Sequence, residues 1–398
     1  MPKAAEIKIP LSKLKVGMTI KLPLSWTEHP FLFNRIGIEK LAQIELIKTL
    51  NVSFVYLISG EHLIVKETVN ESPKPQPTPE QIAEETQVFV RKSIRLGQQR
   101  FIKGAADCRA CFSKLGADPE GTYRSAATLV EELMDHLKET EQPFLSIVNA
   151  GEDISVNQHG ISVAVLAMMI GQSLNMTHSQ LRDIAMGAIF HDLGKQKVPD
   201  IIRRKVSHLS QHEANFLKMH PKFGYDMLAK SELFPESVLD IVLHHHELHD
   251  GSGYPDALKG QQILLETQVV SLANDFESIL RKGELRSPQV ALGYLFKYRI
   301  KKHDAALVST LVKVLGIYPP GTIVRLSNGV TAKVMVTSSD VKAPIVLSAN
   351  TEGKSPKLQF LAEDGLSIDR VLKEEELTSS LIKSLDTNSQ VSFYFSTL

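Results

Sequence analysis

The chain has little cysteine and no excess of charge of either sign. Its 398 residues contain two cysteines, and 45 lysines and arginines balance 45 aspartates and glutamates. Two cysteines are too few for a disulfide-stapled secreted domain, so we expect a reducing compartment and a cytoplasmic protein. A formal net charge of zero creates no global field toward a nucleic acid polymer or a membrane surface. Any anionic ligand must therefore be met by local charge, such as a metal ion.

Apolar segments that could span a membrane or export the chain are also missing. No run approaches the 18 consecutive apolar residues that suggest a transmembrane helix, so we expect no membrane insertion. The opening stretch, MPKAAEIKIP, lacks the apolar core of a signal peptide. The composition, 43% apolar and 23% charged, is ordinary for a globular protein, and the length predicts two or three domains.

The first 86 residues predict a small domain and a linker. Residues 1–70 begin with alternating apolar residues, continue with helical spacing at 37–50 and end with a β-rich run, which together predict a small α+β domain. Four prolines at 71–81 predict a semi-extended segment, and we place the linker at 71–86.

The rest of the chain predicts a helical core between two flanking segments. Amphipathic runs at 87–150 predict a helical connector, whose charged residues form either a solvated face or a signal-transmitting or dimerising surface. A helical core is expected at 151–318. The pattern then changes to β, with a hairpin signal at 327–329, and predicts a small β-rich C-terminal extension over 319–398.

One stretch, 187–260, concentrates histidine and aspartate at the ends of apolar runs and beside glycine-rich turns. The residues concerned are His191, Asp192, His220, His244, His245, His246 and Asp250. Imidazoles and carboxylates suit Zn, Fe, Mn and Ni as ligands. So many of them within one segment predict a metal site with more than one ion.

The order of these residues, with His159 before them and a Gly-Tyr-Pro after them, resembles the HD-GYP family of the HD superfamily. The positions that carry the resemblance are His159, His191, Asp192, Gly194, Lys195, His220, Pro221, Gly224, His245, His246, Glu247, Asp250, Gly251, Gly253, Tyr254, Pro255, Leu258, Gly260 and Ile263. The resemblance covers roughly 150–318. It implies an all-α core and a metal-dependent phosphodiesterase for cyclic di-GMP.

The same resemblance implies a set of metal ligands. Asp192 is expected to bridge two divalent ions, for which Fe or Mn is preferred and Zn or Ni is an alternative. The histidines that complete the two ions are His159 and His191 for one, and His220, His245 and His246 for the other. His244 and His249 are expected to be bystanders.

The resemblance also implies roles around the ions. Lys195 is expected to act with Asp192 in catalysis, touching a phosphate or the nucleophile. The residues expected to shape or pin the substrate wall are Asp250, Gly253, Tyr254 and Pro255. Glu247 is expected to hold a ligand histidine in place.

The chain departs from the family pattern near the end of the core. The position of a late ligand aspartate is occupied by Asn274, and the next acid becomes Glu277. An amide oxygen can ligate, but it lacks the negative charge that holds a divalent ion. The phosphate-contacting arginine falls on Gly283, with Arg281 or Arg286 as replacements.

Other residues with metal or redox chemistry have structural interpretations. Ser155 stands where three-metal members carry a glutamate, which predicts at most two ions. His208 and His212 lie outside the family positions and are expected in solvent. Cys108 and Cys111 form a single CxxC without a second pair, so we expect them to be helix neighbours rather than a redox or zinc motif.

The N-terminal unit carries a second resemblance, and the overall function has two interpretations. The stretch KLKVGM, Trp26 and the residues 29–31 resemble a small domain of unknown function often found before HD-GYP modules. One interpretation is a phosphodiesterase that opens cyclic di-GMP to pGpG or GMP in bacterial signalling. The other, motivated by Asn274 and Gly283, is a degenerate module that senses nucleotide or acts as a scaffold for a diguanylate cyclase, another signalling protein or a second copy.

Overall fold

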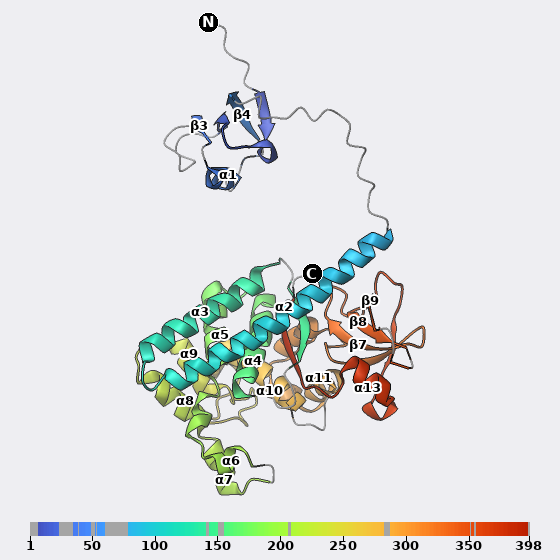
Figure 1. Cartoon of the computed structure of the whole chain (residues 1–398). Coiled ribbons are helices and arrows are strands. Elements are labelled where there is room, and N and C mark those ends of the chain that lie inside the picture. The colour runs from blue at the N-terminus through green and yellow to red at the C-terminus, as the bar shows by residue number, and fades with distance from the viewer. Residues whose placement is uncertain are drawn as a thin grey trace. The chain divides into compact units, whose positions relative to one another are not determined.

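The computed structural model divides the chain into two compact units, Met1–Pro79 and Glu80–Leu398 (Figure 1). The structure describes residues 7–23, 35–38, 40–48, 52, 54–59, 79–140, 143–149, 155–205, 208–281, 287–350, 352–353 and 356–396. None of the helices in these ranges carries an apolar stretch of membrane-spanning length.

The first unit is a small antiparallel sheet with one helix. Its elements are β1 (Ile7–Pro10), a 3₁₀ turn (Leu11–Lys13), β2 (Thr19–Lys21), β3 (Arg35–Gly37), α1 (Leu41–Lys48) and β4 (Phe54–Ser59). The strand order is β1-β4-β2-β3, and Met18, Ile20 and Ile47 are among its fully buried side chains. The α+β prediction for this unit is confirmed. Trp26 and residues 29–31 lie outside the described residues.

Helices dominate the second unit. They are α2 (Pro79–Lys114), α3 (Pro119–Lys138), α4 (Val156–Ser173), α5 (His178–Phe190), α6 (Asp200–Arg203), α7 (Gln211–Leu217), α8 (His220–Ala229), α9 (Glu236–His244), α10 (Leu265–Arg281), α11 (Pro288–Tyr298), α12 (Ala305–Leu315) and α13 (Ser379–Leu385). Short 3₁₀ turns stand at Leu193–Lys197 (η3), Gly260–Gln262 (η4), Ile300–Lys302 (η5) and Glu374–Glu376 (η6). The predicted helical core is confirmed.

The helix α4 lies at the centre of this core. Every residue from His159 to Gly171 is buried, and α5, α10 and α12 pack around the helix. The sequence explains this position, because a helix that is apolar on all sides must be enclosed by others. Its start is fixed by a capping box, in which Ser155 accepts from the Gln158 amide and Gln158 accepts from the Ser155 amide.

The second unit also contains a β-sheet. Its strands are β5 (Phe144–Asn149), β6 (Ile323–Leu326), β7 (Thr331–Val336), β8 (Ile345–Ala349), β9 (Lys357–Phe360), β10 (Ile368–Val371) and β11 (Val391–Ser396). The order is β10-β6-β7-β5-β11, and β8 pairs with β7 and β9. Figure 1 shows β7, β8 and β9 at one end of the unit and α3, α5, α8 and α9 at the other.

Two boundaries differ from the sequence prediction. The helix α2 begins at Pro79, so the last eight residues of the expected linker, 79–86, are helical. Proline is well suited to the first helical turn because its missing N–H has no helical partner there. Residues 144–149, expected in a helical connector, form β5 and pair along their whole length with β11. Pro143 separates this apolar run from α3, and strand partners far along the chain decide its conformation.

A break divides the helical segment that precedes α9. The structure contains two helices, α7 and α8, which are separated at Lys218 and Met219. Pro221 lies in the first turn of α8. A proline ring fits the first turn of a helix but clashes with the preceding turn inside one, so a single helix cannot continue through this position. This break places His220 at the beginning of α8.

Backbones approach closely where η3 meets α8. A Cβ atom added to Gly194 would lie 2.0 Å from the His220 carbonyl oxygen and 2.4 Å from the Gly224 amide nitrogen. Only glycine fits such an approach. The contact holds the residues before Gly194 beside His220.

We therefore expect Gly194→Ala to destabilise the second unit by roughly 1–3 kcal/mol or more, because backbone atoms must move to admit the methyl group. Gly116→Ala is the matched control, since a Cβ there meets no atom within 4 Å. Chemical denaturation of both variants measures the difference. Equal unfolding midpoints for the two variants would contradict this account.

Candidate metal centre

Two groups of potential metal ligands meet at Asp192. One group contains Asp192, His220, His245 and His246, and the other contains His159, His191 and Asp192. Within each group the ligand atoms lie within 4.8 Å of one another. This is the grouping that the family resemblance implied for two ions.

Five elements contribute these side chains. His159 lies in α4, His191 follows α5, Asp192 precedes η3, His220 begins α8, and His245 and His246 follow α9. All of them except His246 are buried, with at most 2% of the side chain and backbone surface exposed. The site is therefore assembled from chain ends that converge in the interior of the helical core.

Three of the histidines are oriented by the same backbone contact. In each, Nδ1–H donates to the carbonyl oxygen three residues earlier: His191 to Ala188 (2.7 Å), His220 to Leu217 (2.8 Å) and His245 to Val242 (2.9 Å). Carbonyls in the last turn of a helix lack helical partners, so they are available as acceptors. The contact fixes the tautomer and leaves each Nε2 lone pair facing the site.

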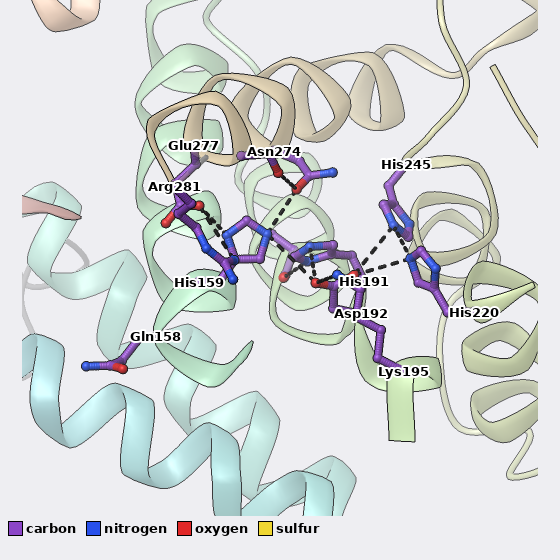
Figure 2. A network of polar contacts seen from close by, with 12 residues as sticks. Gln158, His159, His191, Asp192, Lys195, His220, His245, Asn274, Glu277 and Arg281 are labelled. Carbon is purple, nitrogen blue, oxygen red and sulfur yellow. Dashed lines mark hydrogen bonds and ion pairs between the residues drawn. The ribbon is translucent and has the colours of Figure 1, made fainter. Parts of the chain in front are cut away.

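Asp192 presents one carboxylate oxygen to each group (Figure 2). Its Oδ1 lies 3.3 Å from His220 Nε2 and 3.9 Å from His245 Nε2. Its Oδ2 lies 3.5 Å from His191 Nε2 and 3.8 Å from His159 Nε2. The carboxylate is thus positioned to bridge two centres.

Charge at the site favours ligation near neutral pH. Burial raises the pKa of Asp192, but Lys195, whose Nζ lies 2.6 Å from Oδ2, and the neighbouring histidines outweigh it and hold this pKa well below its usual range. Burial lowers the pKa of His191 to about 3 and lowers the pKa values of His245 and His246 well below the usual value. Asp192 is therefore an anion and these histidines are neutral, as metal ligands must be.

The residues fit divalent metal ions. The Nε2 atoms of His220 and His245 lie 3.2 Å apart, although both rings have already placed a proton on Nδ1. The buried His191 Nε2 has no hydrogen-bond partner in the described part of the chain. Facing or unpartnered lone pairs in a dry interior are costly unless a cation lies between them.

Asn274 and Glu277 approach His159 from α10. The Asn274 Oδ1 lies 3.0 Å from His159 Nε2, and the Glu277 Oε2 lies 2.5 Å from His159 Nδ1. Asp275 points away, toward Arg299 and His303. Sequence reasoning placed Asn274 in the ligand position but gave Glu277 no role. The three-residue spacing on one helix face was the available signal.

The role expected for Glu247 is wrong. Its carboxylate accepts from the backbone amides of Asp256 (2.6 Å) and Leu258 (3.1 Å), and no histidine contacts it in the described residues. A buried carboxylate needs donors, and the loop after the Gly-Tyr-Pro supplies two. Asp250 holds the other side of the loop by accepting from the amide and the hydroxyl of Ser252. Glu247 therefore fixes the loop.

The Gly-Tyr-Pro turn lies against the ligand histidines. A Cβ on Gly253 would meet the backbone of Glu247 and the His246 carbonyl oxygen within 2.6 Å, which requires glycine there. The Tyr254 ring stacks on His246, with centroids 4.7 Å apart. Lys218 Nζ lies 5.4 Å from the centroid of the Tyr254 ring. Sequence reasoning missed Lys218, because only the break between α7 and α8 brings it there.

Several predicted positions lie outside this cluster or outside the described residues. His244 bonds to Asp240 and Asp256 rather than to the two groups. His208 and His212 are exposed, and Cys108 and Cys111 are buried in the core, where burial raises the pKa of both thiols. Gly283 and Arg286 fall in residues that the structure does not describe. Arg281 Nη1 lies 3.9 Å from Glu277 Oε2.

These pKa shifts predict acid sensitivity of the metal-free protein. Unfolded histidines bind protons near pH 6.5, whereas folded His191 stays neutral down to about pH 3. The contribution of each such histidine to the free energy of unfolding is therefore fully present above pH 6.5. As the pH decreases below 6.5, this contribution decreases by up to about 1.4 kcal/mol per pH unit for each such group.

Urea unfolding of chelator-treated protein between pH 7 and pH 5 measures this slope. We expect His191→Gln to flatten it, and His245→Gln to do the same. His212→Gln removes an exposed histidine and serves as the control. If all three variants showed the same dependence of the free energy of unfolding on pH as the unmodified chain, neutral buried histidines would not be its cause.

Comparisons with known proteins agree with this geometry. Residues 128–307 match the family model described as HD domain, and residues 6–157 match a domain of unknown function. The chain is 26% identical to "Cyclic di-GMP phosphodiesterase PA4108" of Pseudomonas aeruginosa over 341 residues, which cover 81% of this chain and 80% of that protein.

Two further proteins are similar to this chain, and the matches cover different fractions of their lengths. "Cyclic di-GMP phosphodiesterase response regulator RpfG" of Xanthomonas campestris is 32% identical over 212 residues, and the match covers 50% of this chain and 56% of that protein. The solved structure of "Bd1817, a HDG"Y"P protein from Bdellovibrio bacteriovorus" covers 77% of this chain and 97% of its own, with 16% identity and a TM-score of 0.44. Residues 128–307 therefore form an HD domain, and its HD motif at Asp192 and its Gly-Tyr-Pro at Tyr254 are similar to those of the HD-GYP family.

Proposed function

We propose that the chain is a metal-dependent phosphodiesterase that hydrolyses cyclic di-GMP to pGpG or GMP. The observation that carries the proposal is the pair of ligand groups that share Asp192. The substrate is proposed because these relatives are named cyclic di-GMP phosphodiesterases. A phosphodiester also agrees with a chain of zero net charge in which local charge must bind an anionic ligand.

The proposed cofactors are two divalent ions, Fe or Mn, with Zn or Ni as alternatives. His159, His191, Asp192 and the amide oxygen of Asn274 would hold one ion, and Asp192, His220, His245 and His246 would hold the other. Such a pair of ions supplies an activated water and neutralises charge on the phosphoryl oxygens.

Lys195 links the metal centre to the substrate. Its ammonium bonds to Asp192 Oδ2 at 2.6 Å and keeps this carboxylate ionised, while 27% of the side chain remains exposed. Three N–H donors are available on an ammonium, so Lys195 can hold Asp192 and donate to a phosphate oxygen at once. We assign it this positioning and charge-neutralising role.

Tyr254 and Lys218 form a wall beside the second ligand group. Tyr254 stacks on His246, and the exposed Lys218 ammonium lies over Tyr254. A cyclic dinucleotide carries two phosphodiesters, and only one can occupy the metal centre. We assign Lys218 to the part of the substrate outside that centre, and we leave Asp250 the role of holding the loop.

The location and the partners follow from the substrate. Cyclic di-GMP signalling and the low cysteine content support a cytoplasmic enzyme. Its proposed partners are a diguanylate cyclase or another signalling protein, or a second copy of the chain.

The first test is turnover by protein purified without oxygen, supplied with Mn or Fe, with the metal content of the same sample counted. We expect two ions per chain and production of pGpG or GMP. Asp192→Asn should reduce kcat by more than about 100-fold, because both ligand groups lose their shared anion. His212→Gln, at an exposed position, is the control.

One ion or none, without product but with measurable nucleotide binding, would contradict the enzyme and support a sensor or scaffold. Asn274 is the observation that favours this second function.

The assignment of Lys218 has its own test. Lys218→Ala should raise KM for cyclic di-GMP about two- to fivefold and leave kcat nearly unchanged, because one exposed contact outside the metal centre is lost. Lys222→Ala is the matched control, since Lys222 is also exposed but lies over Tyr225 and pairs with Asp226. A small diester such as bis(p-nitrophenyl) phosphate should not distinguish the two variants. A fall in kcat for that diester would place Lys218 in the metal centre instead.

A further inference from the structure

Glu277 is a buried carboxylate whose main contact is one ligand histidine. It is fully buried, and its Oε2 bonds to His159 Nδ1 at 2.5 Å (Figure 2). Its Oε1 has no hydrogen-bond partner among the described residues, and Arg281 stands 3.9 Å from Oε2. A dry carboxylate is costly unless a positive charge compensates for it.

His159 differs from the other oriented ligand histidines in its Nδ1 partner. His191, His220 and His245 donate from Nδ1 to neutral backbone carbonyls, whereas His159 faces a carboxylate. With Nδ1–H directed to Glu277, the lone pair of His159 lies on Nε2, which faces Asn274 Oδ1 at 3.0 Å. A cation bound between His159 Nε2 and Asn274 Oδ1 would be held by both atoms.

The two ligand groups have the same formal charge, because the shared carboxylate of Asp192 is the only acid in either of them. The group at His220 has three histidines and the shared carboxylate of Asp192. The group at His159 has two histidines, the same shared carboxylate and a neutral amide where an acid was expected. The half of the site around His159 therefore has a neutral amide where the other half has a third histidine, and Glu277 is the acid that contacts His159 from behind.

We propose that Glu277 is a positioning residue that supplies through His159 the negative charge that Asn274 lacks, and thereby retains the ion on that side. This inference rests on the proposed two-ion centre. A carboxylate bonded to a ligand imidazole fixes its tautomer and increases its basicity toward the metal. Because Asn274 and Glu277 are three residues apart on α10, Asn274 approaches His159 Nε2 while Glu277 contacts Nδ1 on the other side of the ring, and Glu277 is the acid that remains.

The test separates charge from hydrogen bonding. Glu277→Gln keeps an acceptor for His159 Nδ1–H but removes the charge. We expect this variant to bind the ion on the His159 side about 10–100-fold more weakly and, at limiting Mn, to retain one ion instead of two. Glu266→Gln is the matched control, because Glu266 lies on the same helix and contacts Gln180 instead.

A charge-swap variant distinguishes this role from simple packing. Asn274→Asp combined with Glu277→Gln returns one negative charge to the same half of the site, so we expect the second ion to return. A ¹⁵N NMR spectrum of the metal-free protein provides a readout independent of activity. It should show His159 as a single Nδ1–H tautomer in the unmodified chain and in the Glu277→Gln variant.

Three outcomes would overturn the inference. The first is a Glu277→Gln variant that still holds two ions tightly. The second is a Glu277→Gln variant that loses one ion, when the double variant Asn274→Asp, Glu277→Gln does not regain it. The third is an unmodified chain that holds a single ion and nevertheless cleaves cyclic di-GMP. An unmodified chain that holds two ions but does not cleave cyclic di-GMP would reject the proposed function alone, because ion counts need no substrate.

Discussion

The arrangement of the helical core depends on one buried carboxylate. Asp192 lies in the interior beside the Lys195 ammonium, which helps to keep it ionised, and each of its oxygens faces a separate set of histidines. Moving Lys195 away would leave that charge uncompensated. The convergence of five elements at this point brings the histidines to the same carboxylate.

Close backbone approaches make the convergence rigid. Gly194 allows η3 to touch the start of α8, and Gly253 allows the Gly-Tyr-Pro turn to touch the backbone beside His246. Glu247 then ties the same turn through two backbone amides. Gly194 and Gly253 are thus positions where main chain meets main chain, and His191, His220 and His246 lie close to these contacts in the chain.

The sequence predicted which histidines and aspartate lie together better than it predicted the contacts that hold them in place. His191, Asp192, His220, His245 and His246 were predictable because short motifs with fixed spacing carry them. The role of Glu277 depends on how α10 packs against α4, and that of Glu247 on the path of a loop, so neither follows from local pattern. The strand β5 was missed for the same reason, because its partner β11 lies far along the chain and no nearby residue indicates the pairing.

The pairing of β5 with β11 has a consequence for synthesis of the protein. Gly97 and Gln98 of α2 lie against this pair, and Phe393 of β11 stacks on Phe276, which neighbours Glu277 in α10. All six residues of β5 pair with β11, and the ribosome synthesises β11 after all of the proposed metal ligands. The complete core can therefore form only late in translation, and a nascent chain that already carries the whole ligand set is not yet a finished metal centre.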